Sequence, residues 1–298
     1  MKIFMIILPL AFLVYFWAAS FFMFAGTAGA VTYWNVNATV NVTNQAPTVT
    51  NVVVDDDVAS PPNQIDLTPG STKLVYCNGT ANDTNGYSDI TTVSAVFYEN
   101  VTATPASANN NETHYINSSC SVSGGAGVSE TAICAFQILY YANNQTWICN
   151  MTATDSDSAT GTGIDGTTVN LLIGLNISNQ ILNYGDIAPD ATSGSVTENV
   201  TNHGNTQIDL ALNGTNMPCS GVGSINVERQ HYNVTGTEQT YDSMVNLTGT
   251  QTTITNFNLA KRTDASGDSK RTSYWKIQAP LGTKGRCEGN VTFTALAG

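Results

Sequence analysis

Apolar and polar residues alternate along much of the chain. In YWNVNATVNVT, residues 33–43, Trp34, Val36, Ala38, Val40 and Val42 share one face, and asparagines and threonines fill the other. A period of two is typical of a half-buried strand. Between residues 46 and 168 no stretch keeps the 3.6-residue period of a helix, so the pattern predicts an all-β protein.

Turn-rich segments divide this pattern into domains. Residues 31–45 hold a separate strand, because Pro47 favours a fresh extended start after it. Residues 46–168 contain expected strands at 48–54, 72–79, 91–99, 132–141 and 145–154. After SATGTGIDGTT, residues 169–298 contain a second series near 170–177, 195–202, 207–213, 224–234, 243–257, 271–278 and 289–296. Short strands at this spacing predict two β-sandwiches, of immunoglobulin-like or jelly-roll type.

The separate strand needs a partner for its apolar face. It either folds back to complete the second domain, which we favour because no second molecule is needed, or it enters the sandwich of a neighbouring copy by strand addition. In the second domain, ENVTNHGNTQIDLALNGTN has the pattern of a hairpin with HGN at its tip.

The first 30 residues form a membrane-targeting segment. Lys2 precedes an apolar run, and Ala28-Gly29-Ala30 offers a small-residue cleavage site. The run is also long enough to span a bilayer, so the segment is a cleaved signal peptide or a retained anchor helix. Both alternatives place the rest of the chain outside the cell, in contact with the membrane only through this segment.

Six cysteines suit an exported protein, because disulfides persist in oxidising compartments. Alternation turns Cys77 and Cys149 towards the core, which favours a bridge between them like the inter-sheet bridge of immunoglobulin-like domains. Cys120 and Cys134 flank a glycine-rich loop and are expected to pair. Cys219 and Cys287 are alone in the second half and should pair together.

Sequons for N-glycosylation are about twice as frequent as chance predicts for a chain rich in Ser and Thr. The expected acceptors are Asn37, Asn41, Asn78, Asn82, Asn100, Asn111, Asn117, Asn144, Asn150, Asn176, Asn199, Asn213, Asn233, Asn246 and Asn290.

Charge narrows the choice of partners. The net charge is −12, which argues against nucleic acid, and the apolar content of 42% argues against disorder. Residues 46–170 carry twelve acidic residues and one basic residue, Lys73, whereas residues 171–298 carry ten acidic and eight basic. The basic segment AKRTDASGDSKRTS either mates with the acidic domain of another copy or is a solvated loop.

Candidate chemistry is sparse. His114, His203 and His231 belong to no HExxH pair, no GxSxG or phosphate-binding motif occurs, and His114 and His203 are expected in solvated turns, so we expect no enzyme. Oxygen-rich loops offer the one cofactor candidate, calcium; the alternative is plain turns. The candidate ligands are Asp83, Asn85, Asp89, Asp155 and Asp157.

The order of CNGTANDTNGYSDI, CAFQILYYANNQTWICNMTATD, YGDIAPDATSG, VTNHGNTQIDLALNGTN and GRCEGNVTFTA resembles poorly characterised secreted archaeal surface proteins with tandem immunoglobulin-like domains. GDIAPDATSG and VTNHGN also resemble the jelly-roll subunits of surface fibres. The resemblance implies an envelope protein without established chemistry. We therefore expect a glycosylated structural or adhesive protein whose partners are envelope proteins or its own copies; the alternatives are an envelope-glycan-binding protein and a filament subunit assembling by strand donation.

Overall fold

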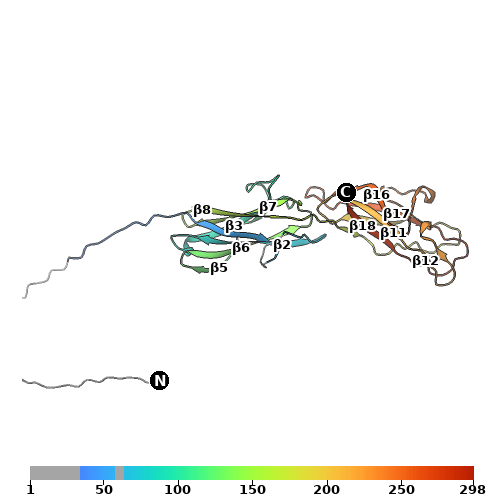
Figure 1. The fold of residues 1–298 in the computed structure, drawn as a ribbon, viewed down its shortest axis with the longest axis horizontal. Helices are drawn as coiled ribbons and strands as arrows, with labels where there is room; N and C mark the ends of the chain where they lie inside the picture. The colour runs from blue at the N-terminus through green and yellow to red at the C-terminus, as the bar shows by residue number, and fades with distance from the viewer. Residues whose placement is uncertain (1–33, 58–63) are drawn as a thin grey trace, which may run out of the picture. The chain divides into compact units, whose positions relative to one another are not determined.

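The computed structural model describes residues 34–57 and 64–298 (Figure 1). Its contacts divide the chain into two units, Met1–Val42 and Thr43–Gly298. The described residues form strands and three short 3-10 turns at Tyr87–Asp89, Val227–Arg229 and Tyr241–Ser243, which confirms the all-β class. No helix among them is long and apolar enough to cross a membrane. The targeting segment expected at 1–30 lies outside the described residues.

The first sandwich consists of two four-stranded antiparallel sheets. One has the order β1-β2-β6-β5, and the other has the order β4-β3-β7-β8. The five strands expected in this domain are present; β4, β5 and β8 were not expected. The strands are β1 (Thr48–Asp55), β2 (Thr72–Asn82), β3 (Ile90–Glu99), β4 (His114–Asn117), β5 (Ser121–Ala126), β6 (Ser129–Leu139), β7 (Thr146–Asp155) and β8 (Thr160–Thr168).

Alternation along β7 builds the core of this sandwich. Trp147, Cys149 and Met151 are fully buried, and the Trp147 ring stacks on Phe97 of β3 with ring centroids 4.9 Å apart. Trp147 Nε1 donates to the carbonyl oxygen of Asn143 at 2.8 Å, so its polar atom is satisfied. The disulfide Cys77–Cys149 joins β2 to β7 and therefore links the two sheets through the core.

Strand β8 lies where the sequence suggested a turn-rich boundary between domains. Its glycines allow the backbone of β1 to approach closely: a Cβ at Gly161 would lie 1.9 Å from Pro47 O, and one at Gly163 would lie 2.7 Å from Val49 O. Asp165 of β8 also accepts a hydrogen bond from Val54 N at 3.0 Å. The glycines of GTGIDG therefore permit strand packing and do not mark a linker.

The second sandwich pairs a five-stranded sheet, β15-β14-β17-β10-β9, with a three-stranded sheet, β16-β11-β18. A two-stranded ribbon, β12-β13, accompanies them. The strands are β9 (Leu175–Ile177), β10 (Val196–Asn202), β11 (Ile208–Gly214), β12 (Met217–Pro218), β13 (Ser224–Ile225), β14 (Gln230–Asn233), β15 (Val245–Asn246), β16 (Thr252–Leu259), β17 (Lys270–Ile277) and β18 (Val291–Ala297). Its core is a separate cluster around Trp275, Leu210, Leu212 and Phe257.

The prediction of a hairpin with HGN at its tip is wrong. β10 and β11 belong to different sheets, so residues 203–207 turn a corner between them. Buried Asn202 organises this corner: its Nδ2 donates to the carbonyl oxygens of Thr206, Leu259 and Ala260, and its Oδ1 accepts from Gly204 N. A two-residue alternation predicts strands, but it does not say to which sheet each strand belongs.

The separate strand expected at 33–43 is not formed in the described part of this stretch. Residues 34–43, the described part of this stretch, belong to no strand, and Trp34, Val36, Val40 and Val42 are each more than four-fifths exposed. A strand requires a neighbour with which to exchange backbone hydrogen bonds. The alternating pattern is therefore present without a partner for it in the described residues.

Candidate functional site

Three carboxylates from separate segments meet in the first sandwich. Asp83 directly follows β2, Asp89 ends the 3-10 turn Tyr87–Asp89, and Asp155 is the last residue of β7. One oxygen of each lies within 4.8 Å of the others. Asp83 and Asp155 are only 1% and 2% exposed, whereas Asp89 is partly exposed. We refer to Asp83, Asp89 and Asp155 as the carboxylate cluster.

Hydrogen bonds hold the cluster in place unequally. Asp155 accepts from Asn44 Nδ2 at 2.7 Å and from the backbone of Asp157 and Ala159 at 3.0 and 2.8 Å. These bonds, that from Asn44 above all, keep the pKa of Asp155 below its ordinary value, so this carboxyl is charged at neutral pH. Asp89 accepts from the Ser156 hydroxyl.

Asp83 is the incompletely satisfied member. Its Oδ1 accepts from Asn85 N at 2.7 Å, but its Oδ2 is buried and has no hydrogen-bond partner among the described residues. The amide oxygen of Asn44, whose Nδ2 contacts Asp155, is likewise buried without a partner. A buried carboxylate oxygen without a donor, such as Asp83 Oδ2 beside two like charges, is costly unless a cation is bound.

The structure thus gathers three of the five candidate cation ligands. The Asp157 side chain is exposed, and only its backbone reaches Asp155. Asn85 instead contacts residues 43–45: its Oδ1 accepts from Gln45 N at 2.8 Å and its Nδ2 donates to Thr43 O at 3.3 Å. Asn44 was missed, since no local pattern relates it to a loop more than a hundred residues away.

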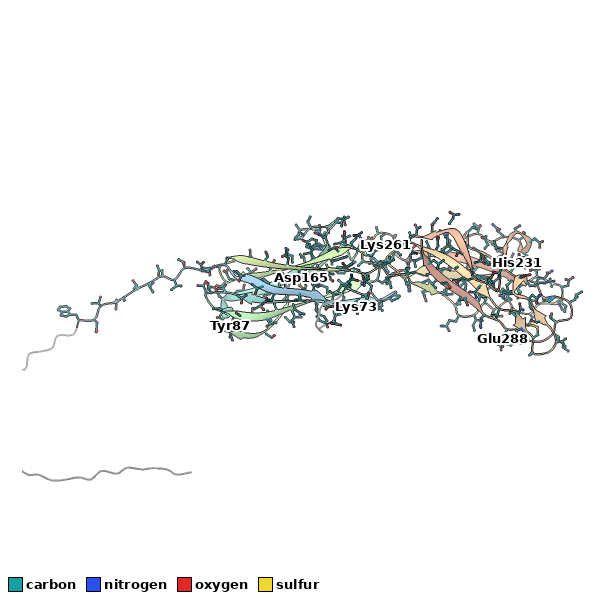
Figure 2. All side chains as sticks on the ribbon, in the orientation of Figure 1. Lys73, Tyr87, Asp165, His231, Lys261 and Glu288 are labelled. Carbon is teal, nitrogen blue, oxygen red and sulfur yellow. A yellow bond between two sulfur atoms is a disulfide. The ribbon has the colours of Figure 1, made fainter. Side chains whose placement is uncertain are left out.

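Positive charge is scarce around the cluster. Between positions 46 and 170 the sequence contains one basic residue, Lys73, which is labelled in Figure 2. Its Nζ lies 3.0 Å from Asp56 Oδ2, so it is already paired. No lysine or arginine of the described chain forms an ion pair with Asp83, Asp89 or Asp155 within 4.0 Å. Within residues 34–57 and 64–298, no ion pair with lysine or arginine thus compensates the negative charges of the cluster.

The remaining cysteines form two more disulfides, Cys120–Cys134 and Cys219–Cys287, and no cysteine is free. The first adds a link beside Cys77, which lies opposite Cys134 in the register of β2 and β6. The second joins two loop segments of the second sandwich and packs against a small apolar cluster of Ile225, Ile277 and Ala279.

Fourteen of the fifteen sequon asparagines have exposed or half-exposed positions; Asn233 does not. It is 7% exposed in β14, its Nδ2 donates to Thr237 O at 2.7 Å, and its Oδ1 accepts from Thr235 N at 3.0 Å. A glycan on Nδ2 would displace the first of these bonds. The expectation that Asn233 is an acceptor therefore does not agree with the folded structure.

The histidines also differ from expectation. His114 was expected in a solvated turn, but it is 0% exposed in β4 and stacks on Tyr98. Burial lowers the pKa of His114, and this effect is partly opposed by the nearby backbone of Pro105 and Thr104. The lowered pKa favours the neutral imidazole at neutral pH. His231 stacks on Tyr241 with ring centroids 3.8 Å apart. His203 lies in its expected turn, near Tyr140.

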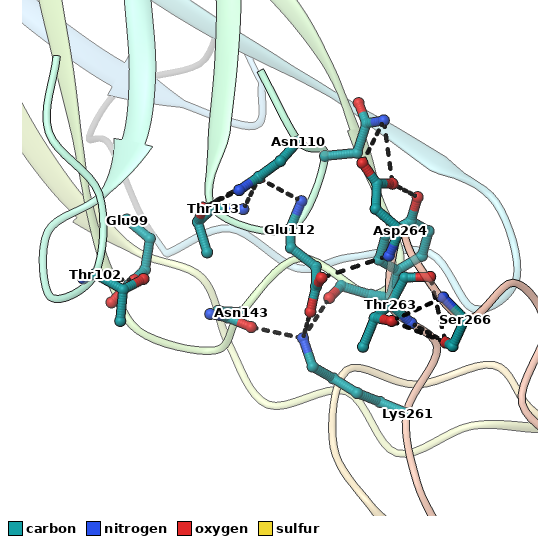
Figure 3. Close-up of polar contacts among 12 residues, drawn as sticks. Glu99, Thr102, Asn110, Glu112, Thr113, Asn143, Lys261, Thr263, Asp264 and Ser266 are labelled. Carbon is teal, nitrogen blue, oxygen red and sulfur yellow. Dashed lines mark hydrogen bonds and ion pairs between the residues drawn. The ribbon is translucent and has the colours of Figure 1, made fainter. Parts of the chain in front are cut away.

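The basic segment contacts the first sandwich of its own chain (Figure 3). Lys261 Nζ lies 3.0 Å from Glu112 Oε1 and donates to Tyr141 O at 2.9 Å. The Tyr141 hydroxyl donates to Asp264 at 2.7 Å, and burial and this bond raise the Tyr141 pKa to about 12. The Arg262 guanidinium lies over the Tyr141 ring. The charge complementarity expected between copies is thus used within the unit Thr43–Gly298.

The second sandwich has an open groove of about 1470 Å³ beside β18. β18 is an edge strand, paired only with β11 in its sheet. The groove lies between residues 177–189 and β18, and its apolar side chains include Leu182, Tyr184, Val291 and Phe293. An edge strand beside apolar side chains is the arrangement that accepts an added strand.

An aromatic platform, which would favour glycan binding, is not found among the described residues. Trp34 and Tyr87 are the exposed aromatic side chains there. Tyr87 belongs to a 3-10 turn and packs beside Gly125, and Trp34 lies outside any strand. Neither is part of a row on a sheet face.

No family model and no curated protein sequence matches the chain. Weak similarity is found to a solved chaperone–tip adhesin complex of CFA/I fimbriae, with 11% identity, a TM-score of 0.29 and coverage of 85% of this chain and 84% of that one. The C-terminal domain of the Streptococcus pyogenes antigen I/II-family protein AspA has 10% sequence identity and a TM-score of 0.25, over 85% of this chain and 96% of that one. The C-terminal domain of the Streptococcus agalactiae polypeptide BspA has 9% sequence identity and a TM-score of 0.23, over 85% of this chain and 96% of that one. Such low scores carry no argument about this chain.

Proposed function

We propose that this chain is an extracellular, N-glycosylated structural or adhesive protein of the cell surface, without catalysis. The observation that carries the proposal is that all six cysteines are paired, with disulfides in both sandwiches. Such pairing suits an oxidising compartment. The outward positions of fourteen sequon asparagines support the same location, because glycans need solvent.

The location is tested by mild proteolysis of intact cells, followed by mass spectrometry of the released peptides. We expect peptides of both sandwiches in the released fraction, with glycans on exposed asparagines such as Asn144 and Asn290. Asn233 serves as an internal control that stays unmodified. Recovery of the protein only after cell lysis, with free thiols and no glycan, contradicts the proposal.

A second candidate function is that of a filament subunit, in which residues 34–42 of one copy enter the groove beside β18 of the next. Two observations favour it. The apolar side chains of this alternating segment are exposed, and an edge strand beside an open groove with apolar side chains in its lining is present in the same chain. Burying four large apolar side chains contributes several kcal/mol, at about 1.5–3 kcal/mol each.

Two single substitutions on opposite faces of this segment test the second candidate. Val36→Asp places a charge on the apolar face, whereas Asn35→Asp adds the same charge to the polar face, and neither changes a sequon. We expect Val36→Asp to abolish filaments in electron micrographs and Asn35→Asp to leave them. Filaments in both variants, or chains that stay monomeric at every concentration before mutation, remove strand donation from consideration.

A further inference from the structure

We propose that the carboxylate cluster of Asp83, Asp89 and Asp155 binds one Ca²⁺ ion and that this ion fixes residues 43–45 to the first sandwich. The inference is independent of the proposed surface function, since it rests on the geometry of three loop segments. It would hold for this sandwich in any compartment that supplies calcium.

The strongest support is the unpaired oxygen of Asp83. Asp83 is 1% exposed, and its Oδ2 is buried without a hydrogen-bond donor beside two further carboxylates. Buried carboxylates persist when paired or bound to a metal. Since no described lysine or arginine forms an ion pair with the cluster, a cation is the partner that its charge requires.

The ligand set favours calcium among biological cations. All three side chains of the cluster offer oxygen. Zinc prefers nitrogen and sulfur, and the cluster contains neither histidine nor cysteine. Calcium accepts six to eight oxygens in flexible geometry, and water can complete the set on the side of Asp89, which is partly exposed.

The same contacts connect the site to the residues that precede the sandwich. Asn44 bonds to Asp155, and Asn85, whose backbone bonds to Asp83, contacts Thr43 and Gln45. An ion that orders Asp83 and Asp155 thereby also orders the side chains that contact residues 43–45. Calcium removal should loosen this attachment first.

Calorimetric titration of the full chain, stripped with chelator, tests the binding. We expect one Ca²⁺ per chain with a Kd of about 0.1–1 mM, the range of extracellular modules, and at least tenfold weaker binding of Mg²⁺. Asp89→Asn should weaken Ca²⁺ binding at least tenfold. It is the mildest change to the cluster, because among the described residues the Asp89 carboxylate accepts a hydrogen bond only from Ser156. Asp157→Asn, an equal charge loss in an adjacent loop, should change Kd less than twofold.

Three outcomes overturn the assignment. The first is the absence of saturable binding up to about 10 mM Ca²⁺, which is roughly ten times the upper expected Kd. The second is an equal loss of affinity in Asp89→Asn and Asp157→Asn. The third is binding of Mg²⁺ that is as tight as that of Ca²⁺. Hydrogen exchange at the backbone amide of Gln45 tests the second part of the proposal, the attachment of residues 43–45 to the first sandwich. Exchange of this amide should slow at least fivefold with Ca²⁺ in the unmutated protein and should not slow in Asp89→Asn. Exchange that is unchanged by Ca²⁺ refutes the attachment of residues 43–45.

Discussion

The two sandwiches use similar disulfide loops in different places. In the first, Cys77–Cys149 spans 72 residues and runs through the middle of the core, beside Trp147. In the second, Cys219–Cys287 spans 68 residues but joins loop segments outside the main core. The second sandwich also keeps a groove along its edge strand, where Val291 and Phe293 are only half-buried.

This difference shows that loop length and core position are separate properties of a disulfide. Chain entropy depends on the length of the closed loop, which is nearly equal in the two cases. Burial depends on where the sulfur atoms lie, which is different. The bridge of the first sandwich runs through its centre, whereas the bridge of the second lies outside its main core.

The largest expected effect comes from removing each bridge in turn. Chain entropy alone assigns about 4 kcal/mol to either loop. The Cys77→Ala/Cys149→Ala pair should cost about 1 kcal/mol more than Cys219→Ala/Cys287→Ala, because it also leaves a small cavity in the core. Denaturant unfolding followed by the fluorescence of Trp147 or of Trp275 separates the sandwiches, in backgrounds where the other three of the four tryptophans are changed to Phe. Equal losses would show that core position adds nothing.

A smaller effect, about 1–3 kcal/mol, is expected from Gly163→Ala in the first sandwich. The new Cβ would lie 2.7 Å from Val49 O and 2.8 Å from Val52 Cγ2, so β1 must move away from β8. Gly194→Ala in the second sandwich is the matched control, since nothing lies within 4 Å of its Cβ position. If both variants unfold at the same denaturant concentration as the parent, the close approach of β1 and β8 is not rigid.

A pH effect on stability is expected in the first sandwich, at His114. Burial lowers the His114 pKa below 6.5, so between the two pKa values the unfolded chain binds more protons. The contribution of neutral His114 to the free energy of unfolding is therefore fully present above about pH 6.5. This contribution is lost as the pH falls below 6.5, by at most about 1.4 kcal/mol per pH unit. His114→Phe should remove this slope.

The matched comparison for His114 is made in the same sandwich. Burial raises the pKa of Glu130 there, which opposes the histidine effect, but Glu130 is present in both proteins. The difference between the parent and His114→Phe therefore isolates the histidine. A difference that does not vary between pH 7.5 and 5.5 contradicts a buried neutral His114.

The smallest expected effect concerns the contact between the sandwiches. Lys261 and Glu112 are partly exposed, so their pairing should couple the two sandwiches by about 1 kcal/mol or less, and less at high salt. A double-mutant cycle with Lys261→Ala and Glu112→Gln measures this coupling. Lys276→Ala is the control, because Lys276 pairs with Glu238 inside the second sandwich. Equal coupling of Glu112 to both lysines would argue against a specific contact.

The sequence predicts those parts of the fold in which a two-residue period coincides with burial. β7 is the clearest case, because its apolar positions alternate without interruption. The sequence does not predict β8, because the need for its glycines is visible only where β1 packs against it. Nor does the sequence predict the corner at Asn202, where two successive strands enter different sheets. His114 was misplaced because its asparagine-rich surroundings suggested a turn, while its partner Tyr98 lies in another strand.

The carboxylate cluster was predictable only in part, for the same reason. Asp83, Asp89 and Asp155 could be proposed from loops rich in oxygen ligands. The exclusion of Asp157, the role of Asn44 and the unpaired Oδ2 of Asp83 depend on how three loops meet. Likewise, the basic segment around Lys261 was identified, but whether its partner lay in the same chain or in another copy could not be read from charge.

The bridge between Cys77 and Cys149 has a mechanical consequence for a protein that is pulled from both ends. Under tension, the chain between the two cysteines, whose sequence separation is 72, cannot be drawn out, since the force passes through the sulfur atoms. At about 3.4 Å per residue, roughly 240 Å of chain stays withheld even after the sheets separate. A rupture in this sandwich therefore lengthens the molecule only by the segments outside the loop, and the closed loop remains available to guide refolding when the load is released.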